Sequence, residues 1–175
     1  MPDTPRKDPP TVTPEGKSIQ TLIDGVRLRP AITVPDDRGT VCEIFCSEWT
    51  FDEFPMVYAY QVTIRPQRVK GWVVHHLQDD RIFLSQGTVR VVLYDDRPES
   101  PTYKMVNELF IGEHNRALLR IPRNVYHAIQ NVGTVDVLFI NVPTRPYNHA
   151  DPDKYRLPLN NDVIPYRFEG HSEEL

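Results

Sequence analysis

Residues 70–87, KGWVVHHLQDDRIFLSQG, decide the fold class of this chain. Two apolar runs of strand length flank the tandem histidines His75 and His76, and the second run ends at a glycine, Gly87. Residues 121–131, IPRNVYHAIQN, carry a further histidine, His127, inside another short apolar run. Runs of this length bounded by Gly and Pro are typical of β-strands. The two segments therefore predict histidines on or beside β-strands.

The rest of the chain from residue 28 onward has the same character. Short apolar runs, many of them alternating, are broken by Gly, Pro and Asp. Many short strands with closely spaced turn signals imply an antiparallel sandwich or barrel. Two exceptions are expected. Residues 47–54, SEWTFDEF, predict a short helix with Ser47 as its N-cap, and the Pro-rich region after Pro143 predicts short helical turns such as DPDKYR.

Length and composition predict one globular domain. The chain has 175 residues, 39% of them hydrophobic and 25% charged, which suits a single core. Residues 1–17 lack hydrophobic periodicity and predict a flexible tail or an arm that orders on a partner subunit, so the domain is expected to span residues 18–175. The net charge of −4 argues against nucleic-acid binding. Without an apolar run long enough for a bilayer or a signal peptide, we expect no membrane association and a cytoplasmic location.

The two histidine segments resemble the paired sequence blocks of a cupin barrel, which implies an all-β, antiparallel jelly-roll fold. A cupin metal is normally held by three His and one carboxylate. Here His75 and His127 keep their ligand types, but Leu77 and Arg81 stand where further ligands would be needed. We therefore expect no metal and no other cofactor. A register slip of one residue would let Asp79, Asp80 or His76 substitute.

Further motifs make the chain resemble the dTDP-4-dehydrorhamnose 3,5-epimerase family of metal-free cupins. They are Asp37-Arg38-Gly39 with Glu43, Lys70-Gly71 before His75, Ser100-Pro101-Thr102-Tyr103, Ile121-Pro122 before His127, and Leu159-Asn160-Asn161-Asp162. The resemblance runs from about residue 38 to residue 166. It implies a nucleoside-diphosphate sugar as ligand and a homodimer in which an N-terminal strand crosses to the neighbour.

The resemblance also implies roles for single residues. His75 takes the place of the catalytic base, and strand alternation would turn it inward together with Leu77 and Asp79. The family's tyrosine acid is missing, because the late strand offers Phe139 or Ile140. Tyr147 or Tyr155 could replace it, and we choose Tyr147. Asp162 is the candidate partner of the base. The expected ligand-binding residues are Arg38, Glu43, Lys70, Gln78, Arg81 and His127.

Three functions stay open at this point. The first is an epimerase or isomerase that acts on a nucleoside-diphosphate 4-keto sugar through a histidine base. The second is a binding protein that keeps the nucleotide-sugar pocket but has lost catalysis, which the missing tyrosine favours. The third is a metal-dependent cupin enzyme. The retained His75 and the basic residues favour the first over the third.

Overall fold

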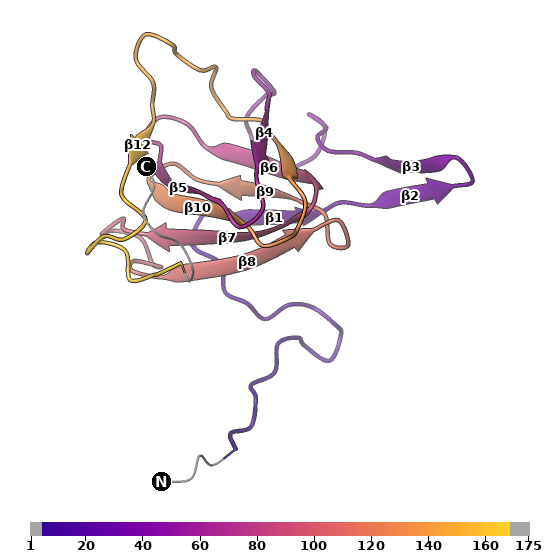
Figure 1. Cartoon of the computed structure of the whole chain (residues 1–175), viewed down its shortest axis with the longest axis horizontal. Helices are drawn as coiled ribbons and strands as arrows, with labels where there is room; N and C mark the ends of the chain where they lie inside the picture. The colour runs from indigo at the N-terminus through magenta and orange to yellow at the C-terminus, as the bar shows by residue number, and fades with distance from the viewer. Residues whose placement is uncertain (1–4, 169–175) are drawn as a thin grey trace.

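The computed structural model of the chain describes residues 5–168, and this part consists of β-strands and loops without a helix. The strands are β1 (Arg27–Pro30), β2 (Thr33–Asp36), β3 (Gly39–Cys42), β4 (Tyr60–Ile64), β5 (Val69–Val74), β6 (Asp80–Gln86), β7 (Thr88–Asp95), β8 (Val106–Gly112), β9 (Ala117–Ile121), β10 (Val125–Asn131), β11 (Val137–Asn141) and β12 (Tyr155–Arg156). None of residues 5–20 is buried, and they run outside the barrel (Figure 1).

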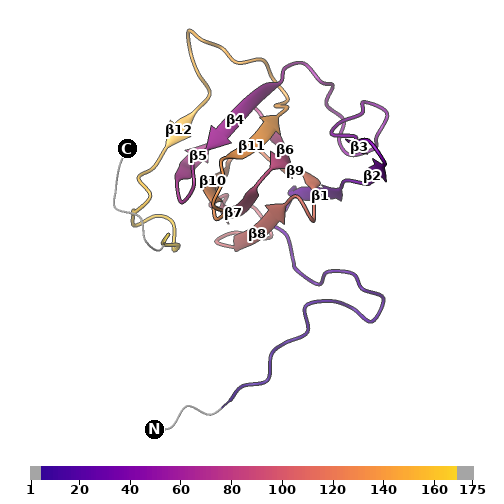
Figure 2. The same cartoon turned by 45° about the vertical axis from the view of Figure 1, so that its right-hand side comes forward.

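Two five-stranded sheets face each other. The first has the order β1-β9-β6-β11-β4 and the second the order β12-β5-β10-β7-β8 (Figure 2). All strand pairs between these neighbours are antiparallel. The predicted all-β antiparallel fold is therefore confirmed.

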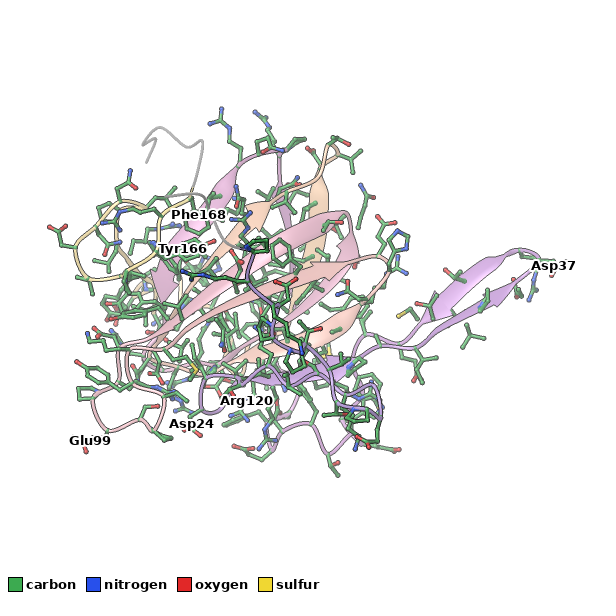
Figure 3. The ribbon with its side chains drawn as sticks, turned by 90° about the horizontal axis from the view of Figure 1, so that it is seen from below. Asp24, Asp37, Glu99, Arg120, Tyr166 and Phe168 are labelled. Atoms are coloured by element: carbon green, nitrogen blue, oxygen red, sulfur yellow. The ribbon has the colours of Figure 1, made fainter. Side chains whose placement is uncertain are left out.

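Strand β7 shows how the alternating pattern builds two apolar layers. Val91 and Leu93 point into the core between the sheets, while Val92 and Tyr94 point to the outer face of the second sheet. That outer face is also buried, because the C-terminal segment, with Ile164, lies over it. The aromatic side chains of this segment are visible in Figure 3. Burial on both faces explains the continuous apolar run from Val91 to Tyr94 in β7.

The expected helical elements are wrong. Residues 47–54 form turns, and the backbone N–H of Phe54 is bound by the Asp52 carboxylate at 2.9 Å instead of by a helical carbonyl. In the segment DPDKYR, Tyr155 and Arg156 pair with β5 as strand β12. Pro152 and Pro158 on either side lack the amide hydrogen that a helix needs, and the edge of the second sheet offers partners to the residues between them.

One hairpin leaves the barrel. Strands β2 and β3 pair only with each other and project outward, with Asp37 at the tip (Figure 3). Apolar side chains of this hairpin face solvent, with exposed fractions of 79% for Ile32, directly before β2, 60% for Val34 and 68% for Val41. The part of the chain that the structure describes contains no helix long and apolar enough to span a bilayer.

Candidate active site

A cavity of about 820 Å³ lies between the two sheets. Its walls come from β4, β6 and β11 on one side and from β5 and β10 on the other, and Lys154 and residues 156–160 form its rim. Apolar side chains such as Val62, Ile82, Ile129 and Phe139 line most of it. The polar and charged lining residues are Tyr60, Lys70, His75, Asp80, His127, Asn141, Lys154, Arg156 and Asn160.

Two histidines and one aspartate meet in this cavity. The Oδ2 atom of Asp80 lies 3.4 Å from Nε2 of His75 and 3.6 Å from Nε2 of His127. The two imidazole rings are 5.5 Å apart between centroids. All three side chains are buried, with residue exposures of 8% for His75, 4% for Asp80 and 7% for His127. We call these three residues the His-Asp-His cluster.

The local fold explains how residues five positions apart come to face each other. Strand β5 ends at Val74 in the second sheet and β6 begins at Asp80 in the first, so residues 75–79 cross between the sheets. The Asp153 carboxylate holds this crossing, because it accepts the backbone N–H groups of His76, Leu77 and Gln78 at 2.7–3.1 Å. His75 and Asp80 thus reach the cavity from opposite walls.

The expected alternation through residues 75–79 is wrong for the same reason. A crossing segment has no strand ladder to carry the period of two. Leu77 is exposed, and the buried Asp79 turns away from the cavity to accept two hydrogen bonds from Arg120, at 3.0 and 2.6 Å. Asp80 occupies the inward position instead, while His76 lies outside against Tyr155.

The two histidines differ in their affinity for a proton. Burial lowers the pKa of His75, but the hydrogen bond and negative charge of Asp80 outweigh burial, so the net shift is upward. Burial dominates at His127 and lowers its pKa to about 4. Burial raises the pKa of Asp80, yet the bond from His75 and both nearby imidazoles bring it down to about 2. Asp80 is therefore ionised and paired chiefly with His75.

A tyrosine stands on the opposite wall. Asn141 on β11 pairs in register with Tyr60 on β4, and its Nδ2 donates to the Tyr60 hydroxyl at 2.8 Å. The Asn141 Oδ1 accepts from the backbone N–H of Arg81 at 3.2 Å, which fixes the amide orientation. Burial and the charge of Asp80 raise the pKa of Tyr60 to about 12. Tyr60 is thus protonated, and since its oxygen already accepts a bond, its own hydrogen is available to the cavity.

Three basic side chains reach the cavity: Lys70 from β5, and Lys154 and Arg156 from the rim. All three residues are exposed, and within residues 5–168 none of them has a carboxylate within ion-pair distance, whereas the two buried arginines of this part of the chain are each paired with an aspartate. Partial desolvation and the like charges of Arg156 and Lys70 lower the pKa of Lys154, against the attraction of Asp80. Cations gathered without counter-charges in a cavity are suited to an anionic ligand.

The structure separates the sequence-predicted basic and acidic residues. Lys70 lines the cavity, but Arg81 is fully buried elsewhere and paired with Asp52 at 3.1 Å. Arg38 lies in the turn of the β2–β3 hairpin, 84% exposed along its side chain and bound to Asp36 at 2.6 Å. Glu43 follows β3 and is exposed. Neither Arg38, Glu43 nor Arg81 belongs to the described lining of this cavity.

The remaining predicted residues divide similarly. His127 lines the cavity, and Gln78 supports it from behind by donating from Nε2 to Asp80 Oδ1 at 3.0 Å. Tyr147 is exposed and packs edge-on against His149, and Asp162 is exposed near the C-terminal segment. Within the described residues, both lie outside the cavity lining.

Sequence reasoning named Asp80 only as a substitute metal ligand, and it missed Tyr60, Asn141, Lys154 and Arg156 as site residues. The signal for Asp80 was its place directly before the apolar run of β6. Tyr60 and Asn141 are paired only by the register of β4 against β11. This register cannot be read from the sequence. Lys154 and Arg156 were expected in a helical turn, and the two-residue strand β12 was needed to bring them to the rim.

Comparisons with known proteins agree with this geometry. A family model described as dTDP-4-dehydrorhamnose 3,5-epimerase matches residues 20–160. A probable low-salt glycan biosynthesis epimerase of Haloferax volcanii is 36% identical over 139 residues, which cover 79% of this chain and 89% of that protein. The spore coat polysaccharide biosynthesis protein SpsL of Bacillus subtilis is 31% identical over 147 residues, 84% of this chain and 97% of that one.

Solved structures share the fold. The crystal structure of a dTDP sugar isomerase from Desulfovibrio desulfuricans has a TM-score of 0.77 at 28% identity, covering 86% of this chain and 94% of the other. A dTDP-4-dehydrorhamnose 3,5-epimerase from Bacillus anthracis, with TDP and pyrophosphate bound, has a TM-score of 0.75 at 18% identity, covering 89% and 91%. The expected cupin-type barrel of this family is therefore confirmed.

Proposed function

Because the chain belongs to the dTDP-4-dehydrorhamnose 3,5-epimerase family, we propose that its cavity binds a nucleoside-diphosphate 4-keto sugar and inverts a carbon beside the keto group. One observation carries this proposal beyond family membership. A buried histidine-aspartate pair and a protonated tyrosine face the same cavity from different strands, and unpaired cations stand at its rim.

His75 is the proposed base. Its Nδ1–H donates to the backbone carbonyl of Asp153, so the lone pair of the neutral ring is at Nε2, on the side of Asp80. A 4-keto group acidifies the neighbouring C–H bond. Nε2 takes that proton, and the bonding electrons move to the keto oxygen to give an enolate. Asp80, 3.4 Å from Nε2, stabilises the imidazolium that forms.

Tyr60 is the better-supported acid. Inversion requires that the proton return to the same carbon from the other face as the keto group re-forms. The Tyr60 hydroxyl comes from the sheet opposite His75, and Asn141 holds its oxygen so that its hydrogen is free. Tyr147 stays a second candidate, because its charge when ionised would raise the pKa of Tyr60. Its side chain, however, is exposed.

Lys70, Lys154 and Arg156 are proposed to bind the diphosphate. Phosphate oxygens would supply the negative charge that these three side chains lack within residues 5–168. The guanidinium of Arg156 can also donate two parallel hydrogen bonds to a phosphate group. Holding the diphosphate at the rim would place the sugar deeper, next to His75. Solved relatives support this ligand class: an epimerase of Streptomyces bikiniensis was crystallised with dTDP-quinovose.

Deuterium exchange tests the reaction. We expect the wild-type protein to incorporate deuterium from D2O at C3 or C5 of a dTDP-4-keto-6-deoxy sugar. His75→Asn should abolish incorporation while the dissociation constant for dTDP, measured by calorimetry, changes little, since proton transfer belongs to the transition state. Tyr60→Phe should slow product formation and leave exchange by the base, and Tyr147→Phe tests the second candidate for the acid in the same assay.

The competing function is that of a binding protein without catalysis. Tight dTDP-sugar binding with no exchange at any sugar carbon, across several 4-keto substrates, would favour it and reject the epimerase. If Tyr147→Phe slows product formation and Tyr60→Phe does not, the assignment of the acid changes while the reaction stands.

A homodimer is also proposed. The apolar residues Ile32, Val34 and Val41 of the projecting hairpin are exposed in the single chain, and packing against a second copy would bury them. Light scattering after size exclusion should give twice the chain mass of 20.3 kDa. A monomer at micromolar concentration would refute the exchange of this hairpin. The cytoplasmic location stays a prediction, and cell fractionation would check it.

A further inference from the structure

The His-Asp-His cluster has the composition and spacing of a metal site. We propose that His75, Asp80 and His127 bind one divalent transition-metal ion, and that the bound ion blocks Nε2 of His75. The first part stands on the geometry of the cluster alone. The second part rests on the proposed function, because it assigns Nε2 as the proton acceptor.

The separations of the ligand atoms support the first part. Metal bonds of about 2.0–2.1 Å in a tetrahedral zinc site set ligand atoms roughly 3.3 Å apart. Asp80 Oδ2 lies 3.4 Å from the Nε2 atom of His75 and 3.6 Å from that of His127. Both separations are already close to the distance between two ligand atoms of a zinc site. The ligand atoms of the cluster all lie within 4.8 Å of one another. Small side-chain rotations of the histidines would bring their two Nε2 atoms to the same separation.

The outer hydrogen bonds orient both rings as ligands. Nδ1 of His75 contacts the Asp153 carbonyl, and Nδ1 of His127 lies 3.4 Å from the Val125 carbonyl. A carbonyl oxygen only accepts, so each Nδ1 carries the hydrogen and each neutral ring presents its Nε2 lone pair to Asp80. Ligating histidines in proteins characteristically donate the other ring nitrogen in this way. Gln78 likewise holds the second Asp80 oxygen at 3.0 Å.

Counting hydrogens shows why a cation fits better than a proton. Two Nε2 atoms face one carboxylate oxygen. A single proton on His75 satisfies that contact, but it leaves the His127 lone pair opposite the Asp80 oxygen at 3.6 Å with no hydrogen between them. A divalent ion would accept all three lone pairs at once. Two histidines and one carboxylate with open positions are a donor set that zinc, iron and cobalt use.

From the sequence we expect no metal, because Leu77 and Arg81 stand where ligands would be needed, but neither residue belongs to the His-Asp-His cluster. Leu77 is exposed and Arg81 is bound to Asp52, so neither blocks the ion. Lys154 opposes the ion, because its positive charge reaches His127. Asp153, whose carboxylate binds the crossing segment, partly offsets that charge. A bound ion would keep its open positions toward the cavity, where the His75 lone pair would no longer accept a substrate proton.

Cobalt and zinc titrations test the metal site. Untagged protein, stripped with a chelator and exchanged into clean buffer, should bind one Zn²⁺ per chain by calorimetry, and Co²⁺ should produce a visible absorption band at the same stoichiometry. Asp80→Asn and His127→Gln should each weaken binding by more than about 100-fold, beyond the 10–100-fold that an outer-shell partner usually contributes. His114→Gln, which removes an exposed histidine on the loop after β8, is the matched control.

The folded state of each variant is checked by circular dichroism and by its melting temperature. Zn²⁺ should raise the melting temperature of the wild-type protein and of His114→Gln, but not that of the cluster variants. Absence of a stoichiometric heat and of a cobalt band in folded wild-type protein would overturn the site. Equal weakening by His114→Gln and His127→Gln would also overturn it, because the binding would then be scattered over surface histidines.

The blocking effect has its own readout. One equivalent of Zn²⁺ should suppress deuterium exchange of the sugar at least tenfold, and a chelator should restore it. Zinc binding without suppression would reject the block and keep the metal site. If the metal-free protein shows no exchange with any substrate, the proposed function fails and the block with it, while the calorimetric stoichiometry still decides the metal site.

Discussion

Removal of the Arg81 side chain should lower the stability of the fold without a selective effect on nucleotide binding. Arg81 is 0% exposed along its side chain, and its partner Asp52 is 2% exposed. Besides that ion pair, the guanidinium donates to the carbonyls of Val142 at 2.7 Å, Phe54 at 2.8 Å and Pro55 at 2.8 Å. These bonds tie the loop before β4 to the ends of β6 and β11, so Arg81 is expected to act as a structural anchor.

The magnitude follows from what Arg81→Met would leave behind. Breaking a buried ion pair by removing one partner costs about 3–5 kcal/mol, because the other charge stays buried. For a chain of this size, 1 kcal/mol shifts the melting temperature by about 2–4 °C, so the expected decrease is roughly 6–20 °C. Asp52→Asn in the same background should recover part of the loss, since the isolated carboxylate is then gone.

Thermal unfolding and dTDP calorimetry on the same preparations show whether Arg81 stabilises the fold or binds the ligand. Lys154→Met is the contrast: it should weaken dTDP binding about 10–100-fold, the equivalent of about 1.5–3 kcal/mol for a charged hydrogen bond, with little change in melting temperature. A folded Arg81→Met protein that melts like the wild type but loses dTDP affinity would refute this reasoning and restore Arg81 as a ligand-binding residue.

Two further predictions concern the scaffold. Burial raises the pKa of Asp95, but hydrogen bonds from Arg97, Ser100 and Thr102 outweigh it and hold the pKa well below its usual range. The resulting stabilisation is present above about pH 3.9 and is lost below it, so the unfolding free energies of wild type and Asp95→Asn should converge between about pH 5 and 2; a constant gap would contradict the shift. Gly71→Ala should destabilise the protein by about 1–3 kcal/mol, because an added Cβ would lie 2.6 Å from the Cα of Ala128; an unchanged melting temperature would contradict that clash.

The sequence predicted the fold better than it predicted the site. Alternation within one strand is a local property, so β7 could be recognised from Val89, Val91 and Leu93 alone. The inward placement of His75 and His127 also followed from the paired segments. Asp80 did not follow, because it depends on where β5 stops and the chain crosses to the other sheet. Tyr60 depends on a register between strands far apart in sequence.

Pairing of charge is what finally distinguishes binding residues from structural ones in this chain. The sequence shows many basic residues beside strands, and each has the same formal charge. In the described part of the structure, Arg81 is neutralised by Asp52 and Arg120 by Asp79, so burial of these cations is already compensated and neither needs a ligand. Lys154 at the cavity rim has no such partner within residues 5–168 and keeps a lowered pKa. An incoming diphosphate would relieve the repulsion among the rim cations, which is why ligand binding should stabilise this protein most at low salt, where that repulsion is least screened.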